Sequence, residues 1–380
     1  MHFDFTEDQK LIQQTAREFA REEIAPTAVE RDKNGIFPAE IVKKLGELGF
    51  LGMMVDPDYG GAGMDTLSYV LAMEEISKVD ASVGVIMSVN NSLVTYGLQK
   101  YGSEHIKQKY LIPLAQGQQL GAFCLSEPEA GSDATSQTTE GVQVGDTWEI
   151  TGTKNWITNG TSADVFLVVA QTDREKGYRG ITTFVIEKGA PGFEHGVKED
   201  KLGIRSSDTC SLHFNKTPVP AENIVWEAGK GFNFAMDTLN GGRIGIAAQA
   251  LGIASASLDA AINYSKQRKA FGHPIKDFQA IQFKIADMAM NLEAARLLTY
   301  RAAMLKDDHQ KFVKEAAMAK LFASKVAVHN ALEAIQIHGG YGYVREYLVE
   351  RYLRDAKITE IYEGTSEVQH IVIARELLKD

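Results

Sequence analysis

The chain has 380 residues, of which 44% are apolar and 24% charged. This length exceeds what one hydrophobic core usually supports, so we expect two or three domains with a large buried interior. The net charge of -10 and the isoelectric point near 5.5 argue against a nucleic-acid-binding surface, because phosphate binding needs clustered Lys and Arg.

Two cysteines, Cys124 and Cys210, lie far apart without a CxxC pair, so neither a disulfide framework nor a zinc site is indicated. The nine His residues are scattered without a ligand spacing, so no metal is expected. The N-terminus lacks the features of a signal or transit peptide, and no apolar run reaches the ~18 residues of a membrane span. These features predict a cytoplasmic protein with no membrane span.

The first part of the chain is predicted to be helical. Thr6 and Gln9 form a capping box, followed by apolar residues at helical spacing until Pro26, which should end the helix. Further helices are expected over residues 38–48, 65–78 and 81–100, with another opening at Ser103. Residues 1–120 therefore predict an N-terminal helical domain.

The pattern changes at Gly121, where short β-rich runs begin to alternate with turns. The runs are residues 121–126, 142–144, 147–152, 165–172, 181–188 and 210–214. Gly145-Asp146 between two of them is a hairpin signal. Residues 121–226 predict a small antiparallel β-barrel or sandwich, without the strand, glycine-rich turn and helix of a dinucleotide-binding fold.

Residues 227–380 return to a helical pattern. Long helices are expected over residues 232–269, 278–306, 312–337 and 365–379, which suggests a C-terminal four-helix bundle. The first contains many alanines, which favour close packing. The fold class is therefore α+β, with a β domain between two helical domains.

Near the end of the chain, Glu363 stands directly before Gly364, Thr365 and Ser366. Gly364 permits a close turn, and Thr365 or Ser366 can cap the helix that follows. A carboxylate held there and shielded from water is a plausible general base. A solvated Glu before an ordinary helix cap is the alternative.

Two segments of the middle domain carry polar and aromatic groups at close intervals. The loop after residue 123 offers amides and hydroxyls to a polar ring or phosphate, or is an ordinary strand exit. Trp156 and Thr158 flank one apolar residue, so both should point to one face, where an indole can lie along a planar cofactor. The alternative for Trp156 is a place in the core.

Five segments, taken together, resemble the successive signatures of the acyl-CoA dehydrogenases in order and spacing over essentially the whole chain. They are Glu127-Pro128 with Gly131-Ser132-Asp133, residues 156–160, residues 267–272, residues 336–342, and Tyr362-Glu363-Gly364-Thr365. The resemblance implies a homotetramer with non-covalently bound FAD between subunits. It also implies electron-transferring flavoprotein as the electron acceptor.

By this resemblance, Glu363 removes the α-proton of an acyl-CoA thioester while a hydride leaves the β-carbon for flavin N5, giving a trans-2-enoyl-CoA. The family binds the thioester oxygen with the backbone amide of the catalytic Glu and a ribityl hydroxyl of FAD. The resemblance places the following residues at the cofactor: Phe123, Cys124, Leu125, Ser126, Glu127, Gly131, Ser132, Trp156, Ile157, Thr158, Arg268, Gln279, Gln336, Gly339, Gly340, Thr365, Ser366 and Glu367. Arg268, Gln279 and residues 336–340 are expected to reach FAD from a neighbouring subunit, although Arg268 alone also fits a solvated helix end.

Substrate contacts are expected from Ser132, Arg243 and Gly364, whereas Asn240 stands where many members carry Asp. No acid precedes Asp259 on the helix after Arg243, where some branched-chain and long-chain members place their base, so Glu363 remains the matched candidate. The segments around Arg243 and Glu363 most resemble short-chain (butyryl-CoA) dehydrogenases. We hypothesise that Gln249 and Thr359 close the bottom of the acyl tunnel, with a structural bond of Gln249 to a neighbouring helix in the tetramer as the alternative.

Other readings of the sequence remain open. They are an acyl-CoA dehydrogenase with medium-chain or branched-chain preference, a related flavin oxidase, and a helical scaffold that binds no flavin.

Overall fold

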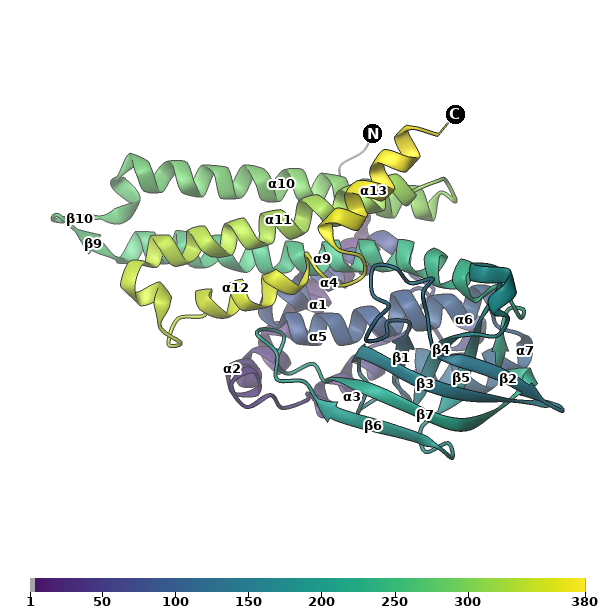
Figure 1. The fold of residues 1–380 in the computed structure, drawn as a ribbon. Coiled ribbons are helices and arrows are strands. Elements are labelled where there is room, and N and C mark those ends of the chain that lie inside the picture. Colours follow the sequence, from purple (N-terminus) through teal and green to yellow (C-terminus); the bar gives the residue numbers. More distant parts are fainter. Residues whose placement is uncertain (1–3, 380) are drawn as a thin grey trace.

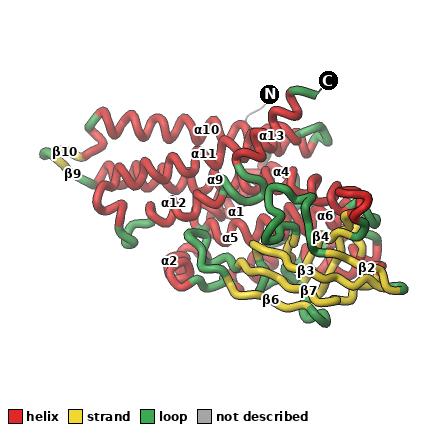
Figure 2. Tube along the Cα trace, viewed as in Figure 1, coloured by secondary structure: helices red, strands yellow, loops and turns green. Residues whose placement is uncertain are grey.

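The computed structural model describes residues 4–379, and its elements follow the predicted order of helices, strands and helices (Figure 1). Residues 1–3 and 380, which belong to the first and last predicted domains, lie outside the described part. Figure 2 shows the strands of the middle part gathered at one end of the molecule, with helices along the rest of its length and a short two-stranded hairpin at the opposite end.

The N-terminal part is helical, and its predicted caps are present. The Thr6 hydroxyl accepts from the Gln9 N–H, and the Gln9 side chain accepts from the Thr6 N–H. Asp65 and Ser103 also cap the helices that follow them. The α-helices of this part are α1 (Glu7–Phe19), α2 (Ala25–Asn34), α3 (Ala39–Glu47), α4 (Thr66–Val79), α5 (Ala81–Ser88), α6 (Tyr96–Tyr101), α7 (Glu104–Ile106) and α8 (Ile112–Ala115).

The prediction that Pro26 ends the first helix is wrong. The chain passes from α1 through a π-helical turn, Ala20–Ile24, directly into α2. Pro26 lies in the first turn of α2, where its missing N–H is least disruptive. The helix ends instead at Gly35, which adopts a left-handed φ of 64°.

The middle part is one eight-stranded sheet in the order β6-β7-β3-β2-β4-β5-β8, with β1 paired to β4. Its strands are β1 (Gly121–Cys124), β2 (Glu140–Val144), β3 (Thr147–Thr158), β4 (Val165–Gln171), β5 (Ile181–Glu187), β6 (Phe193–Lys198), β7 (Thr209–Pro220) and β8 (Ile224–Val225). The predicted hairpin at Gly145 joins β2 to β3. The sheet is mixed rather than wholly antiparallel, because β1 runs parallel to β4.

Two strands of the middle part escaped the sequence analysis for different reasons. β6 carries mostly exposed, polar residues, so it lacks an alternating apolar pattern. β8 has only two residues, too few for any pattern. Both pair with neighbouring strands, so tertiary contacts decide their conformation.

Strand β4 has a buried residue at every position because it faces two cores. Val165, Leu167 and Val169 pack into the large core shared with the helices. Phe166, Val168 and Ala170 pack into a smaller core within the β domain. Because successive side chains of a strand point to opposite faces, β4 packs against both cores and joins the β domain to the helical body.

In the C-terminal part, α9 (Gly231–Gln267), α10 (Gln279–Asp307) and α11 (Val313–His338) run side by side (Figure 1). The short strands β9 (Lys269–Ala270) and β10 (His273–Pro274) form a hairpin that projects from one end. Two shorter helices follow, α12 (Val349–Ile358) and α13 (Ser366–Leu377). Helix α12 was not predicted, because its run of charged residues conceals the apolar positions that it buries.

Helix α9 is long and apolar enough to cross a membrane by length and composition, which the sequence analysis did not expect. Its apolar window is 83% buried inside the protein. The helix therefore serves as the central core element of the helical body.

The contact of α9 with α4 depends on glycine. A Cβ at Gly252 would lie 2.6 Å from the Glu74 carbonyl oxygen and 2.7 Å from the Lys78 backbone nitrogen. Both are backbone atoms, so neither can move away as a flexible side chain would. The absence of a side chain at Gly252 is what lets the two helices approach closely.

We expect Gly252→Ala to lower the free energy of unfolding by about 1–3 kcal/mol, since the added methyl forces α4 and α9 apart. Gly241→Ala is the matched control, because a Cβ there meets its nearest neighbouring atom at 3.8 Å. The control should be neutral or stabilising by up to about 1 kcal/mol, the helix-propensity difference. Urea unfolding of both variants measures the effect, and equal stabilities would contradict this account of the contact.

Candidate active site

The Glu363 side chain lies against α9, in space left by a glycine. A Cβ at Gly242 would come within 2.0 Å of Glu363 Oε2 and 2.8 Å of Leu93 Cδ2. Glu363 itself has a left-handed φ of 52°, which is strained for a non-glycine residue. The turn from α12 to α13 thus directs this carboxylate inward, so the alternative of a solvated Glu is wrong.

The environment of Glu363 favours its neutral form. Its Oε2 atom is inaccessible to solvent and has no hydrogen-bond partner among residues 4–379. Burial raises the pKa of Glu363 to about 7, although the positive charges of Lys320 and Arg243 partly oppose the shift. A carboxylate with a pKa near neutrality can exchange a proton at physiological pH.

The neighbouring residues of α9 are buried and bonded to one another or to the adjoining helices. Arg243 donates to Asn240 Oδ1 at 2.6 Å. Gln249 donates to the Ala81 carbonyl at 2.8 Å and accepts a hydrogen bond from Tyr362 OH. Both groups of the Gln249 amide therefore have partners within the chain, whereas the alternative from the sequence placed the bond of Gln249 in the tetramer and stays a prediction.

Thr359 is completely buried, and its hydroxyl donates to the Ala356 carbonyl within its own turn. A role of Gln249 and Thr359 as the floor of an acyl tunnel stays a prediction. The predicted cap of α13 is supplied by Thr365, whose hydroxyl accepts from the Val368 N–H. Gly364, Ser366 and Glu367 lie in the same turn, and Glu367 is exposed.

The first predicted cofactor segment is mostly buried. The side chains of Phe123 and Leu125 pack into the large core, and Cys124 packs into the core of the β domain. Only backbone atoms of these three can therefore face a cofactor. Ser126 is half-buried, and the predicted positions Gly131 and Ser132 are exposed.

Glu127 points inward to a buried ion pair. Lys154 Nζ donates to Glu127 Oε1 at 2.7 Å, to the Leu125 carbonyl at 3.0 Å and to Gln137 at 3.0 Å. The Glu127 carboxylate also accepts from the backbone amides of Thr138 and Thr139. Its carboxylate is thus fully engaged in ordering the loop and in tying it to β3.

The second predicted segment follows Lys154 directly on β3. A bulge lies between Lys154 and Ile157, and Trp156 adopts a φ of 61°. The Trp156 side chain is 61% exposed, so the alternative of a core Trp is wrong. Ile157 points into the β core, and Thr158 is half-buried. Lys154 therefore connects the two segments that the sequence analysis assigned to the flavin.

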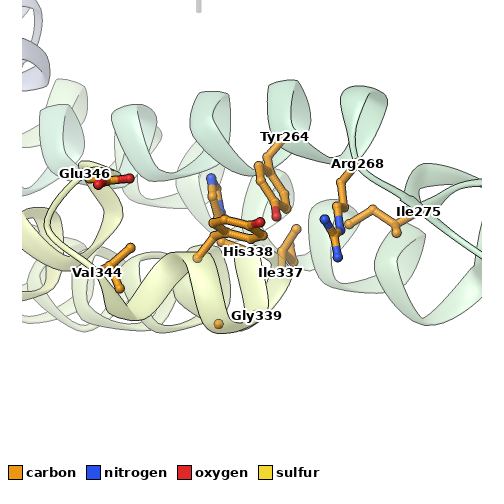
Figure 3. Close-up of a pocket in the computed structure, with 10 residues that line it drawn as sticks. Tyr264, Arg268, Ile275, Ile337, His338, Gly339, Val344 and Glu346 are labelled. Carbon is orange, nitrogen blue, oxygen red and sulfur yellow. The ribbon is translucent and has the colours of Figure 1, made fainter.

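A cavity of about 650 Å³ lies at the far end of the bundle (Figure 3). Tyr264 and Arg268 from α9 face Ile337, His338 and Gly339 at the end of α11 (Figure 3). The Tyr264 and His338 rings stack at 4.1 Å, and the buried Tyr264 hydroxyl has no partner among the described residues. Nothing within 4 Å would obstruct a Cβ at Gly339 or Gly340.

The structure places Arg268, Gly339 and Gly340 in this one cavity. Gln279 and Gln336 are exposed at the adjoining ends of α10 and α11. From Gly242 to the C-terminal end of α9 the chain covers 25 residues, or about 38 Å at 1.5 Å per residue. This group therefore does not meet Glu363 and Trp156 within a single chain.

Three family descriptions match almost the whole chain: the acyl-CoA dehydrogenase N-terminal domain at residues 6–118, middle domain at residues 122–217 and C-terminal domain at residues 229–378. The chain belongs to the acyl-CoA dehydrogenase family. It is therefore an oxidoreductase, and the fold class predicted from its sequence is confirmed.

Similar proteins support the same assignment. The short-chain specific acyl-CoA dehydrogenase of Rattus norvegicus is 53% identical over 99% of this chain and 91% of that protein. The solved structure of butyryl-CoA dehydrogenase from Megasphaera elsdenii is 50% identical, covers all of both chains and gives a TM-score of 0.98. A chain in "Electron transferring flavoprotein of Acidaminococcus fermentans: Towards a mechanism of flavin-based electron bifurcation" is 51% identical, with complete coverage and a TM-score of 0.99.

The sequence analysis did not identify three residues of this candidate site. They are Gly242 beneath the carboxylate, Lys154 between the two middle-domain segments, and Lys320 near Glu363. A lysine within the small and apolar residues 316–323 was a usable signal for Lys320, since lysine is almost never buried without a partner. Among residues 4–379, no cluster of three His, Cys, Asp or Glu is placed to hold a metal ion.

We expect Lys154→Met to destabilise this acyl-CoA dehydrogenase by about 3–5 kcal/mol, because it leaves the Glu127 carboxylate buried without its cation. The double variant Lys154→Met with Glu127→Gln should recover part of this loss, since the unpaired charge is gone. Thermal unfolding of the single and double variants gives the coupling between the two residues. Additive losses would contradict the ion pair.

Proposed function

We propose that this chain is a short-chain acyl-CoA dehydrogenase that uses Glu363 as its base and FAD as its electron acceptor. One observation carries the proposal: the Glu363 carboxylate is buried, lacks a protein partner on Oε2, and has a pKa raised to about 7. A carboxylate in water is far too weak a base for the α-proton of a thioester. Burial reduces this gap by making the carboxylate more basic.

Glu363 takes the proton from the α-carbon, and a hydride leaves the β-carbon, so the acyl chain becomes a trans-2-enoyl chain. The Glu363 backbone N–H has no acceptor among the described residues and is available for the thioester oxygen. Such a donor stabilises the negative charge that develops on this oxygen as the α-proton leaves. Arg243, buried with only an amide partner, adds positive charge on the same side.

Bound FAD supplies the two-electron acceptor for the hydride. Two sets of residues in this chain are suited to bind parts of FAD. The exposed Trp156 and Thr158 present an aromatic face and a hydroxyl beside the loop that contains Ser126 and Ser132. At the other end, Arg268 and the open backbone at Gly339 and Gly340 suit a phosphate-bearing group.

These two places are too far apart for one dinucleotide in one chain. Their separation supports the prediction that Arg268, Gln279 and Gln336 serve FAD in a neighbouring subunit. A stripe of exposed apolar residues along α10 also supports assembly. Its members recur every seven residues and are 44–63% exposed: Phe283, Met290, Leu297 and Met304.

Such a seven-residue repeat is typical of helix–helix association. We therefore include a homotetramer in the proposal, with domains at residues 1–120, 121–226 and 227–380. Electron-transferring flavoprotein is the proposed partner that takes the electrons on from the flavin. Cys124 and Cys210 are both free and buried, which supports the cytoplasmic location proposed from the sequence.

The short-chain preference is supported by the rat and Megasphaera relatives. It is also consistent with the packing beside Glu363. Leu93 lies beside Gly242, and two turns further along α9 the Tyr362 hydroxyl donates to Gln249. A longer chain would have to displace Gln249 from partners that it already bonds, which costs about 1–3 kcal/mol for each buried polar group left unpaired.

We expect Glu363→Gln to bind FAD and ligand but to lose about 10²–10⁴-fold in turnover, the usual contribution of a general base. Anaerobic titration with butyryl-CoA should bleach the flavin of the wild type and leave that of the variant oxidised. In the wild type, kcat/KM should rise through a pH near 7, because burial raises the pKa of Glu363 and only its deprotonated form accepts the proton.

The same titration with octanoyl-CoA tests the chain preference, and equal bleaching would contradict the short-chain part. Rapid oxygen consumption would favour a flavin oxidase. A protein that stays colourless after FAD is added would favour a scaffold. Full turnover by Glu363→Gln would remove the assigned base.

We expect Met290→Glu with Leu297→Glu to break the assembly into smaller species and to release FAD. The reason is that charges on the α10 stripe cannot be buried in a helix–helix contact without partners. Sedimentation and flavin absorbance measure the two effects. Val142→Glu, an equally exposed apolar position on β2, is the control and should leave both unchanged.

A further inference from the structure

Lys320 lies inside the molecule on α11, and the proposed reaction gives it no role. Its side chain is 1% exposed. The Nζ atom donates to the Gly364 carbonyl at 2.5 Å. A buried ammonium is costly unless it is paired, so its retention beside the base needs a physical reason.

The turn that Lys320 contacts is strained. Glu363 and Gly364 both have left-handed backbone angles, with φ values of 52° and 92°. A Cβ at Gly364 would lie 2.6 Å from Gln369 Nε2, and the left-handed φ would strain any other residue there. Two donors hold the turn from opposite helices: Lys320 from α11 and Gln369 from α13, whose Nε2 donates to the Gly364 carbonyl at 2.8 Å.

Two positive charges act on Glu363, and Lys320 has the larger effect. Arg243 from α9 is the second. Tyr69 from α4 and the adjacent Tyr362 also face the carboxylate, and both remain neutral because burial raises their pKa. Glu360 and Glu367 act on Lys320 from the two ends of the turn, and Arg375 from α13 acts on Arg243. Lys320 is therefore the main counter-charge of the base.

We propose that Lys320 is a positioning residue for the base: its bond to Gly364 holds the turn that aims the Glu363 carboxylate over Gly242, and its charge opposes the loss of that carboxylate's ionised form on burial. The two roles are separable in this structure, because Gln369 holds the same carbonyl without a charge. The inference rests on the function proposed above.

The test compares pH profiles of kcat/KM for butyryl-CoA in the FAD-loaded protein. In Lys320→Gln the amide keeps a hydrogen-bond donor but no charge. Loss of a nearby positive charge raises the pKa of a carboxylate. The acid limb of the profile, where kcat/KM rises with pH, should therefore move to higher pH by about 1 unit. Gln369→Leu should lower kcat without moving the limb, and Lys320→Arg should restore the wild-type limb.

Lys325→Gln is the control, because this lysine lies on the same helix but is exposed. It should leave both the limb and kcat as in the wild type. FAD absorbance and thermal unfolding establish that each variant is folded. An unmoved limb in Lys320→Gln overturns the proposal, as does an equal shift in Gln369→Leu.

If Lys320→Gln does not fold or retain FAD while Lys320→Arg does, the lysine serves the stability of the bundle and the proposal is also wrong. Failure of the underlying function gives a different result. In that case the wild type itself does not turn over butyryl-CoA, and no limb exists to compare.

Discussion

The burial of the Glu363 carboxylate against Gly242 is the constraint on which the site depends. The carboxylate occupies space that any side chain at Gly242 would fill. Because Oε2 has lost water without gaining a protein partner, the energy of its charged form is raised and its pKa rises to about 7. The same arrangement would be a defect in a structural protein, whereas it suits the role of a base near neutral pH that we propose for Glu363.

Helix α9 both packs the helical body and lines the candidate site. At Gly252 it meets the backbone of α4 closely, and at Gly242 it leaves room for the base. One turn of α9 also supplies Arg243 to the base, and a later turn supplies Gln249 to Tyr362. A helix that must pack tightly along most of its length holds these groups in fixed positions, because packed interiors deform little.

Two pairs of buried charged residues near the proposed cofactor and substrate regions differ in how their charges are satisfied. Lys154 and Glu127 satisfy each other and tie the loop between β1 and β2 to β3, so their net role is geometric. Lys320 and Glu363 lie near each other without a direct hydrogen bond, and the carboxylate keeps a free oxygen. The first pair is satisfied structurally, whereas the second leaves the carboxylate of the proposed base available for reaction.

Local signals in the sequence determined much of the fold. The caps at Thr6, Asp65 and Ser103, the hairpin at Gly145 and the long helices α9, α10 and α11 each follow from neighbouring residues. The family signatures also identified Glu363 as the candidate base, because Gly364 and Thr365 mark the turn and cap that surround it.

Only the tertiary structure decided features that depend on residues far apart in the chain. Pro26 does not end its helix because a π turn accommodates it, and β6 forms because β7 lies beside it. Glu127 turns inward because Lys154 is there to receive it. The basicity of Glu363 depends in the same way on α9 and α11, which exclude water and supply charge from more than 40 residues away. A sequence specifies which groups can ionise, but only packing sets the solvent and the charges around each of them.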